Sequence, residues 1–363
     1  MAQRHDPGLR AALSLVAPGQ PLREGVDRIL LAKMGALIVV GDEPDVLSIC
    51  SGGFLLDAEY SPQRLSELAK MDGAIILAPH ASRIARANVH LLPDPSVSTA
   101  ETGTRHRTAE RVARHVGVTV VAVSEEMSVI TVYHGSSKHV VAPVGRILDR
   151  ATQSISTLER YKARLDAVAA ELSIHEIADQ VNVREVVLVL QRSEMVQRLA
   201  DETRSLLVEL GSEGRLVRLQ LDELLADVET DRARLLRDYL PDGGEWRDGG
   251  RKQLSTIDLD DLDLAVVART VGLDRVGTER QSAGALLGTH LSPRGYRTLA
   301  RIPRLSDGAI EHIVGHFGSL SQVLSADVAA LTQVEGIGEV RARTICEGLK
   351  RVVESITSDV RSR

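Results

Sequence analysis

The chain has 363 residues, of which 43% are hydrophobic, 26% are charged and only 2% are aromatic, and its formal net charge is −6. This length is too great for one ordinary core and predicts two or three domains in a soluble globular protein. The acidic balance excludes a protein that is basic over its whole surface, and the scarcity of aromatic residues disfavours stacking platforms for single-stranded nucleic acid.

Three further features limit the cellular setting. The segment from Met1 to Gln20 lacks the continuous apolar core of a signal peptide, and no apolar run approaches the length of a membrane span. Cys50 and Cys346 lie in different halves of the chain, without metal-ligand spacing around either. We therefore expect a cytoplasmic protein with reduced thiols and no contact with a membrane.

Short apolar runs, punctuated by glycine and proline, fill the first third of the chain. We expect strands at residues 36–40, 46–49, 74–78, 84–89, 118–123 and 130–133, with helices at 62–70 and about 108–115. Strands interleaved with helices predict an α/β domain, residues 1–147, with a largely buried mixed sheet.

Helical spacing dominates from Arg150 to Leu240, where apolar residues recur at intervals of three and four. The best-defined stripe consists of Ile155, Leu158, Tyr161, Leu165, Val168 and Leu172. A coiled-coil seam is the alternative, but the stripe is short, so packing against neighbouring helices is favoured. Residues 211–214 interrupt this pattern, and 241–250 predict a glycine-rich loop in which Trp246 is a local packing anchor. We assign residues 148–290 to an all-α middle domain.

A third unit, residues 291–363, contains short helices and the turn Gly336-Ile337-Gly338. The glycines permit a tight turn and leave backbone N–H groups at a helix start, where a phosphate can bind. We expect Ile337 to fill the space between the helices and Arg341 and Arg343 to flank the phosphate. The pattern resembles the helix-hairpin-helix modules that bind DNA backbones without reading sequence, although a plain turn is the alternative.

The same unit has two further sequence features. Residues 302–318 look like a degenerate first copy of the hairpin that lacks the Gly-x-Gly turn. From Pro293 to Arg363 there are ten Lys or Arg residues against eight Asp or Glu, so the unit is nearly neutral within an acidic chain.

Two polar stretches of the first domain are candidates for chemistry. Asp72-Gly73-Ala74 opens a strand directly after a helix, where an acid can hold a divalent cation or accept a proton. Gly103 to Glu110 places two arginines, a histidine and two threonines at a helix start, which is suited to an anion. The alternatives are an Asp-Gly turn and a solvated helix start with Thr104 as N-cap. P-loop, dinucleotide and zinc motifs are absent.

Together the two stretches resemble the paired motifs of the diadenylate cyclase domain. The resemblance extends to residues 52–54, 87–94 and 123–126. With the helical middle and the hairpin tail, the whole chain is similar to the DNA-integrity-scanning family of diadenylate cyclases. The resemblance implies condensation of two ATP molecules into cyclic di-AMP, with Mg²⁺ or Mn²⁺ and release of two pyrophosphates.

The resemblance also implies roles for individual residues. The catalytic set is Asp72, Arg105, His106 and Arg107, with Asp72 activating the ribose 3′-hydroxyl and helping to place the metal. The ATP-binding set is Asp72, Gly73, Leu91, Thr104, Arg105, His106, Arg107, Thr108 and Ser124. Because Arg105 and Arg107 diverge at a helix start, one is expected to serve the phosphates and the other the subunit interface. The acidic pair Glu125 and Glu126 departs from the family pattern and offers either extra metal ligands or a solvated turn.

Assembly and regulation follow from the same resemblance. One chain holds one ATP, so the reaction needs a face-to-face dimer. The family implies four such dimers in an octamer, joined through residues 148–290 as a helical linker and oligomerisation domain. Branched DNA such as Holliday junctions is expected to bind Gly336, Ile337, Gly338, Arg341 and Arg343 and to suppress synthesis, in signalling of DNA damage and repair. The alternatives are a non-catalytic, nucleotide-sensing DNA-binding scaffold and a nucleotidyltransferase that adds AMP to another acceptor.

Overall fold

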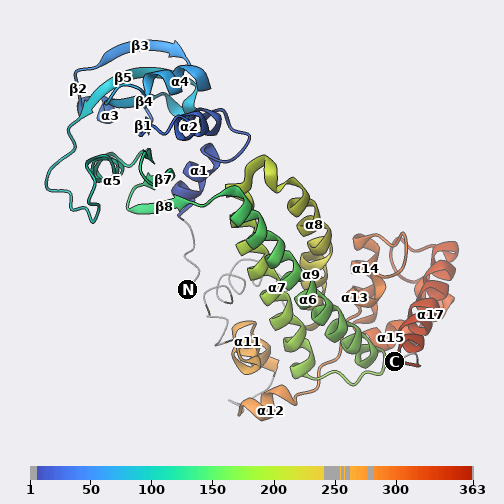
Figure 1. The fold of residues 1–363 in the computed structure, drawn as a ribbon. Coiled ribbons are helices and arrows are strands. Elements are labelled where there is room, and N and C mark those ends of the chain that lie inside the picture. The colour runs from blue at the N-terminus through green and yellow to red at the C-terminus, as the bar shows by residue number, and fades with distance from the viewer. Residues whose placement is uncertain (1–5, 241–253, 255–256, 258–261, 277–281, 362–363) are drawn as a thin grey trace. The chain divides into compact units, whose positions relative to one another are not determined.

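The structure of the chain is a computed structural model, which describes residues 6–240, 254, 257, 262–276 and 282–361 (Figure 1). The chain divides into two compact units. One comprises Met1–Ile155 with Asp201–Leu221, and the other Ser156–Ala200 with Asp222–Arg363. The three predicted domains, 1–147, 148–290 and 291–363, stay predictions.

The first unit is built on a mixed eight-stranded sheet with the order β2-β5-β4-β1-β6-β7-β8, and β3 also pairs with β5. The strands are β1 (Ala36–Val40), β2 (Cys50–Ser51), β3 (Phe54–Glu59), β4 (Ala74–Leu77), β5 (Arg83–Leu91), β6 (Thr119–Ser124), β7 (Val129–His134) and β8 (Ser137–Val141). Only β1 and β4 pair in parallel; the other pairs are antiparallel. The predicted α/β domain with a mixed sheet is confirmed.

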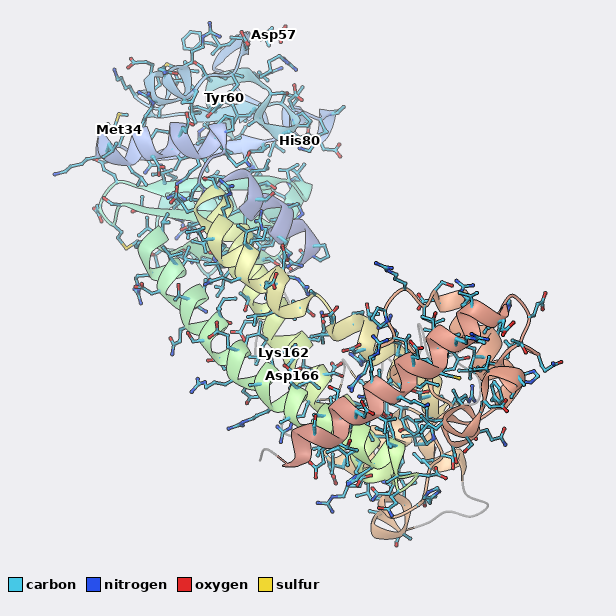
Figure 2. The ribbon with its side chains drawn as sticks, turned by 90° about the vertical axis from the view of Figure 1, so that its right-hand side faces the viewer. Met34, Asp57, Tyr60, His80, Lys162 and Asp166 are labelled. Carbon is cyan, nitrogen blue, oxygen red and sulfur yellow. The ribbon has the colours of Figure 1, made fainter. Side chains whose placement is uncertain are left out.

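Helices cover both faces of this sheet. The side chains of Ile38 and Val40 join a core with α1 (Pro7–Leu15), α2 (Pro21–Leu31) and α4 (Pro62–Leu68). Val39, between them, joins the opposite core with α3 (Pro44–Ser48) and α5 (Thr104–Val116). Because consecutive residues of β1 enter two different cores, the strand reads as an unbroken apolar run. On the first face the Tyr60 hydroxyl, labelled in Figure 2, donates to the Pro21 carbonyl at 2.9 Å.

One predicted strand is wrong. Residues 46–49 lie in and just after helix α3, which has Pro44 in its first turn. Val46 and Ile49 are buried whereas Ser48 is exposed, which is the spacing of a short helix and not of a strand. Helices α1 and α2 and strands β2, β3 and β8 have no counterpart among the predicted elements.

From Val144 to Tyr239 the chain is helical, as predicted for its middle, and further helices follow. They are α6 (Val144–Ile177), α7 (Val183–Leu210), α8 (Arg215–Leu225), α9 (Val228–Tyr239), α11 (Leu264–Thr270) and α12 (Ala283–Leu287), with short 3₁₀ turns at Gly211–Gly214 and Leu273–Val276. The predicted loop at 241–250, with Trp246, lies outside the described residues. None of the described helices is long and apolar enough to cross a membrane.

The tail of the chain forms a compact group of helices around its own core. They are α13 (Tyr296–Leu299), α14 (Asp307–Phe317), α15 (Leu320–Ser325), α16 (Val328–Leu331) and α17 (Glu339–Arg361). Buried Leu299 and Ile302 from the first half meet Leu331, Val334 and Ile337 from the second. The predicted helix-hairpin-helix tail is confirmed, with Ile337 buried between helices as expected.

Candidate nucleotide site and nucleic-acid interface

The sheet topology collects the predicted site residues of the first unit at one edge. Since β1 and β4 run parallel, Gly35 and Gly73, which directly precede them, lie at the same edge. Strands β5 and β6 run antiparallel to these two, so Leu91 and Ser124, at their ends, lie at that edge as well. Asp72 adjoins Gly73 and is exposed.

The start of α5 reaches this same edge through Arg105. A Cβ at Gly35 would lie 2.0 Å from Nη1 of Arg105, so the guanidinium rests directly on the glycine backbone. Arg105 Nη1 also donates to the carbonyl of Val123, the residue before Ser124, at 3.5 Å. The two motifs, separated by some thirty residues in sequence, therefore meet at one edge of the sheet.

The N-terminus of α5 has the form of an anion site. Gly103 is the N-cap and no side chain caps the helix, so the alternative in which Thr104 is the N-cap is wrong. Helix starts leave backbone N–H groups without intrahelical acceptors and carry a partial positive charge, which favours phosphate. The first turn contains no acidic residue that would compete. Thr104 is exposed and Thr108 half-buried.

The two arginines of the motif point in different directions. While Arg105 lies against Gly35, Arg107 is exposed and approaches the carbonyls of Glu101 at 3.4 Å and Thr102 at 3.5 Å. Arg107 therefore contacts the segment that precedes α5, whereas Arg105 contacts the edge of the sheet.

His106 belongs to a chain of polar contacts that sequence reasoning missed. Its Nδ1 lies 3.0 Å from the Tyr133 hydroxyl, which donates to Glu101 Oε1 at 3.0 Å. Lys138 forms an ion pair with the same carboxylate. Among the described residues, Nε2 of His106 is buried and has no hydrogen-bond partner. A tyrosine inside the apolar strand 129–134 is the sequence signal that points to such a contact, since a buried hydroxyl needs a partner.

The electrostatics of these polar contacts favour a neutral His106 imidazole and an ionised Glu101 carboxylate. Burial is the main reason why the pKa of His106 is lowered; Glu101 opposes the shift, whereas Lys138 and Arg105 add to it. For Glu101, burial acts to raise the pKa, but hydrogen bonds from Lys138 and Tyr133 lower it overall. Burial and the bond to Glu101 raise the pKa of Tyr133.

Behind Asp72 the backbone is unusually close-packed. A Cβ at Gly73 would lie 2.4 Å from the carbonyl carbon of Asn88, and one at Gly53 would lie 2.6 Å from the carbonyl oxygen of Ala87. Asn88 itself has a φ of 54°, where the register between β4 and β5 shifts. This bulge, absent from the predicted site, fixes the strand entrance at which Asp72 stands.

The remaining predicted residues lie at the β6–β7 turn. The Ser124 hydroxyl accepts a hydrogen bond from the Met127 amide at 3.3 Å, and Glu125 and Glu126 are both exposed. No group of three or more His, Cys, Asp or Glu side chains within the described residues is placed to hold a metal by itself.

In the tail, the structure gives two hairpins of the same form. Helices α16 and α17 are joined by a turn with Gly336 at φ 78°, and α13 and α14 by a turn with Arg304 at φ 64°. Both Arg304 and Gly336 are exposed. The degenerate first copy therefore keeps the backbone turn, with an arginine in the left-handed conformation that normally favours glycine.

The two arginines after the second hairpin have local partners. Arg341 Nη1 approaches the Gly336 carbonyl at 3.4 Å, and Arg343 pairs with Glu339 at 2.6 Å on the exposed face of α17. Exposed pairs of this kind contribute little to stability, so both side chains are readily redirected to a phosphate.

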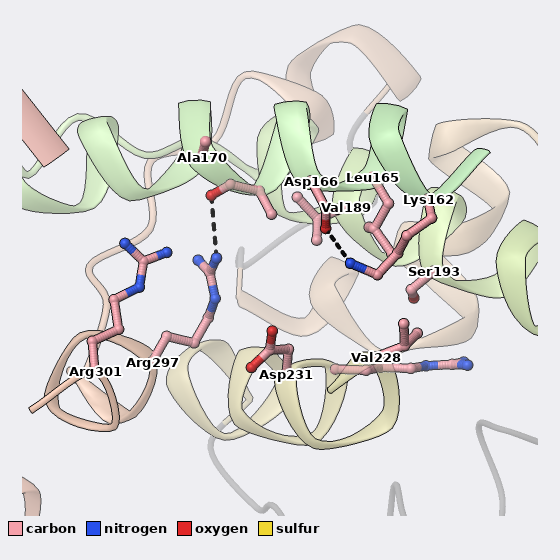
Figure 3. A pocket seen from close by; sticks show the side chains of 12 residues that line it. Lys162, Leu165, Asp166, Ala170, Val189, Ser193, Val228, Asp231, Arg297 and Arg301 are labelled. Atoms are coloured by element: carbon pink, nitrogen blue, oxygen red, sulfur yellow. Dashed lines mark hydrogen bonds and ion pairs between the residues drawn. The ribbon is translucent and has the colours of Figure 1, made fainter. Parts of the chain in front are cut away.

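A cavity of about 170 Å³ lies among α6, α7, α9 and the residues around α13 (Figure 3). Figure 3 shows Arg297 and Arg301 at one end, and Lys162 paired with Asp166 at 2.6 Å nearer the other. Arg297 pairs with Glu176 at 2.7 Å, and Arg301 donates to the Ser173 hydroxyl at 2.9 Å. Since these cations already have partners, the cavity has little to attract an anion.

A buried carboxylate beside this cavity joins the helical middle to the tail. Asp238, at the end of α9, is 1% exposed and accepts three backbone hydrogen bonds at the start of α13. The donors are the amides of Gly295 at 2.7 Å, Tyr296 at 2.6 Å and Arg297 at 2.9 Å. Asp238 therefore caps a tail helix with a side chain from the linker.

Comparison with protein families gives three matches along the chain. Residues 23–138 match the nucleotide-binding region of the DisA bacterial checkpoint controller, and residues 141–279 match its linker region. Residues 296–351 match a SAM-like helix-hairpin-helix tandem, which agrees with the two hairpins of the tail.

Individual relatives are similar over almost the whole chain. The DNA integrity scanning protein DisA of Parafrankia sp. (strain EAN1pec) is 50% identical over 350 residues, which are 95% of each chain. The protein of the same name from Acidothermus cellulolyticus is 51% identical over 355 residues, 96% of this chain and 94% of that one. A solved double mutant of DacA from Staphylococcus aureus is 26% identical and covers 37% of this chain and 87% of its own, with a TM-score of 0.28 that is too low to carry an argument.

Proposed function

The chain belongs to the DisA family of bacterial checkpoint controllers, and from this premise we propose that it condenses two ATP molecules into cyclic di-AMP and releases two pyrophosphates. One observation carries the proposal: the Asp72-Gly73 strand entrance and the uncapped start of α5 meet at one sheet edge. An acid and an anion site side by side are what attack of a hydroxyl on a phosphate requires.

Each side chain then has a defined task. Asp72 takes the proton from the ribose 3′-hydroxyl as this hydroxyl attacks the α-phosphate of the other nucleotide. The N–H groups at the start of α5 and Arg105 bind the phosphates and neutralise charge as pyrophosphate leaves. Gly73, Leu91 and Ser124 lie at the same edge. With Thr104 and Thr108 of α5 they complete the ATP-binding set that we assign. The work is positioning and charge neutralisation, without a covalent nucleophile.

The residues at this edge suit Mg²⁺ or Mn²⁺ that arrives with the nucleotide. Mg²⁺ is usually held by one or two carboxylates together with substrate phosphates, and Asp72 is an exposed carboxylate beside the proposed phosphate site. Such an ion supplies Lewis-acid stabilisation of the phosphate charge. Glu125 and Glu126 are the second-choice ligands, because they stand in the exposed turn after Ser124.

A single chain carries half of the reaction. Each 3′-hydroxyl must attack the phosphate of a nucleotide held elsewhere, so two such edges have to face each other in a dimer. The exposed Arg107 is the arginine we assign to this subunit contact. Four such dimers in an octamer are the assembly we propose for the whole protein.

The tail provides for regulation by DNA in damage signalling and repair. Two hairpins with exposed turns suit contacts with phosphate backbones, and we assign branched DNA such as Holliday junctions as the ligand that suppresses synthesis. The residues assigned to DNA are Gly336, Ile337, Gly338, Arg341 and Arg343, with Ile337 acting by supporting the turn from the core.

The test is product formation by the full-length protein. Incubation with ATP and Mg²⁺ or Mn²⁺ should give cyclic di-AMP, and Asp72→Asn should abolish it. ATP bound without turnover by the wild type would favour the nucleotide-sensing scaffold. Transfer of labelled AMP to a protein or nucleic acid would instead favour a nucleotidyltransferase of another kind.

A further inference from the structure

The contacts of His106 fix where its proton lies. The carboxylate of Glu101 can only accept hydrogen bonds when ionised, and its lowered pKa keeps it ionised at neutral pH. The single hydroxyl proton of Tyr133 is therefore directed to Glu101 Oε1, 3.0 Å away. The Tyr133 oxygen is then an acceptor toward His106, whose Nδ1 lies 3.0 Å from it. Nδ1 must carry the proton.

The other ring nitrogen follows from this assignment. A neutral imidazole with its proton on Nδ1 has a bare lone pair on Nε2. Nε2 of His106 is buried and, among the described residues, has no hydrogen-bond partner. A buried acceptor without a donor is costly, which makes it a candidate to receive one from a ligand.

From this geometry we propose that Glu101 and Tyr133 are positioning residues that fix the proton of the neutral His106 imidazole on Nδ1, so that Nε2 accepts a hydrogen bond from an N–H or O–H group of the bound nucleotide. The proposal rests on the ATP site proposed above. It changes the expected role of His106, because a phosphate oxygen offers only acceptors and cannot satisfy this nitrogen. The donors available on ATP are the ribose hydroxyls and the adenine amino group.

The charged groups around His106 make the proposal testable by pH. Glu101 lies on the segment before α5, Arg105 is the preceding residue of the helix, and Lys138 comes from β8. Glu101 favours the imidazolium, whereas both cations oppose it. Loss of the carboxylate and loss of the lysine charge should therefore shift the protonation of His106 in opposite directions.

The direct test is the tautomer of His106 in the full-length protein, read by ¹⁵N–¹H correlation of ¹⁵N-histidine and assigned with His106→Gln. We expect a protonated Nδ1 and a bare Nε2 at neutral pH. Tyr133→Phe should move the proton to Nε2, and Tyr60→Phe, which removes a tyrosine hydroxyl contact on the opposite face of the sheet, should change nothing. An imidazolium or a protonated Nε2 in the wild type would overturn the proposal, whether or not the protein makes cyclic di-AMP.

Kinetics test the connection to the nucleotide. Tyr133→Phe should lower kcat/KM about tenfold, the effect of one lost hydrogen bond. Glu101→Gln should move the acidic limb of the pH–rate profile to lower pH, and Lys138→Met should move it to higher pH. Equal shifts in one direction, or none, would indicate a structural role only and contradict the proposal.

Analogues identify the donor. Binding of 2′-deoxyATP, 3′-deoxyATP and purine riboside triphosphate, which lacks the amino group, should be compared between the wild type and His106→Ala. The analogue that lacks the relevant donor should lose affinity in the wild type but not in the variant. If all three analogues lose the same affinity relative to ATP in both proteins, His106 accepts no hydrogen bond from the nucleotide and this part of the proposal fails.

Discussion

Gly73 and Asn88 touch so closely that no side chain fits between them. A Cβ on Gly73 would lie 2.4 Å from the carbonyl carbon and 2.5 Å from the Cα of Asn88. Asn88 is itself in the left-handed region, with Gly53 packed against its carbonyl oxygen on the other side. The glycine of the motif is therefore required by the packing of β4 on β5, apart from any contact with a nucleotide.

Gly73→Ala should consequently destabilise the first unit before it affects chemistry. The added methyl meets backbone, which cannot swing aside, so we expect a loss of about 1–3 kcal/mol in the free energy of unfolding. Urea unfolding of the full-length protein measures this. Gly103→Ala is the matched control, because a Cβ there meets nothing within 4 Å and the loss should be only about 0.5 kcal/mol, from the weaker N-cap of α5. Equal losses in both variants would contradict this explanation.

The sheet was largely predictable because its central strands are buried on both faces. Residues 36–40, 74–77 and 120–123 have no polar position, which is the pattern of a strand between two layers of helices. Strand β3 escaped prediction because all of its side chains except Ala58 are exposed, so it shows no alternation. Residues 46–49 have the apolar content of a strand, although Pro44 favours a helix start.

The candidate site was predictable where it is local in sequence. Asp72 and the run from Gly103 to Glu110 stand out as polar segments at element boundaries. The contact between His106 and Tyr133 depends on α5 packing across β7, and no spacing in the sequence encodes that packing. The turn at Arg304 was hidden for another reason, since arginine gives no sign of a left-handed backbone.

Mixed dimers test whether cyclic di-AMP synthesis needs an active site from each of two chains. If both nucleotides must be activated by facing Asp72 side chains, a dimer of wild type and Asp72→Asn makes no complete product. After subunit exchange at equal amounts, synthesis should fall to about one quarter of that of pure wild type, the share of fully wild-type dimers. Independent chains would retain about one half, so cyclic di-AMP formed per total protein distinguishes the two.

The second hairpin should depend on a small, uncharged turn. Gly336→Glu places a carboxylate on a residue with φ 78° at the proposed phosphate contact, so affinity for branched DNA should fall at least tenfold. Gly315→Glu is the matched control, because this glycine is exposed on α14 with nothing within 4 Å, and it adds the same charge. Gel-shift titrations at fixed salt measure both. An equal loss of DNA affinity in the two variants would mean that the added negative charge alone, and not its place in the hairpin turn, weakens binding.

The backbone turn of the first hairpin carries strain that the second avoids. Arg304 occupies the left-handed region at a cost of about 1 kcal/mol, which glycine would relieve. Arg304→Gly should therefore leave the unfolding free energy unchanged or slightly raised, whereas Gly336→Ala should lower it by about 1 kcal/mol. If Arg304 contacts a phosphate, Arg304→Gly should also reduce the salt dependence of DNA binding by about one ion.

Asp238 should make the second unit sensitive to pH. Burial raises the pKa of Asp238 from 3.8 to about 7, Glu176 adds to the shift, and the backbone hydrogen bonds from Arg297 and Gly295 oppose it. Because the folded pKa lies above the unfolded one, the folded state binds an extra proton between these values. The contribution of this group to stability is therefore fully present below about pH 4 and is lost as pH rises toward 7.

Asp238→Asn removes that titration. The variant should lose about 1–3 kcal/mol overall, because its amide cannot accept all three backbone hydrogen bonds, and its unfolding free energy should fall less between pH 5 and pH 7.5 than that of the wild type. Asp307→Asn is the matched control, since that side chain is 77% exposed, and it should keep the wild-type slope. Urea unfolding at the two pH values gives both quantities. A slope unchanged by Asp238→Asn would show that this carboxylate stays ionised in the folded protein, held by its three N–H donors.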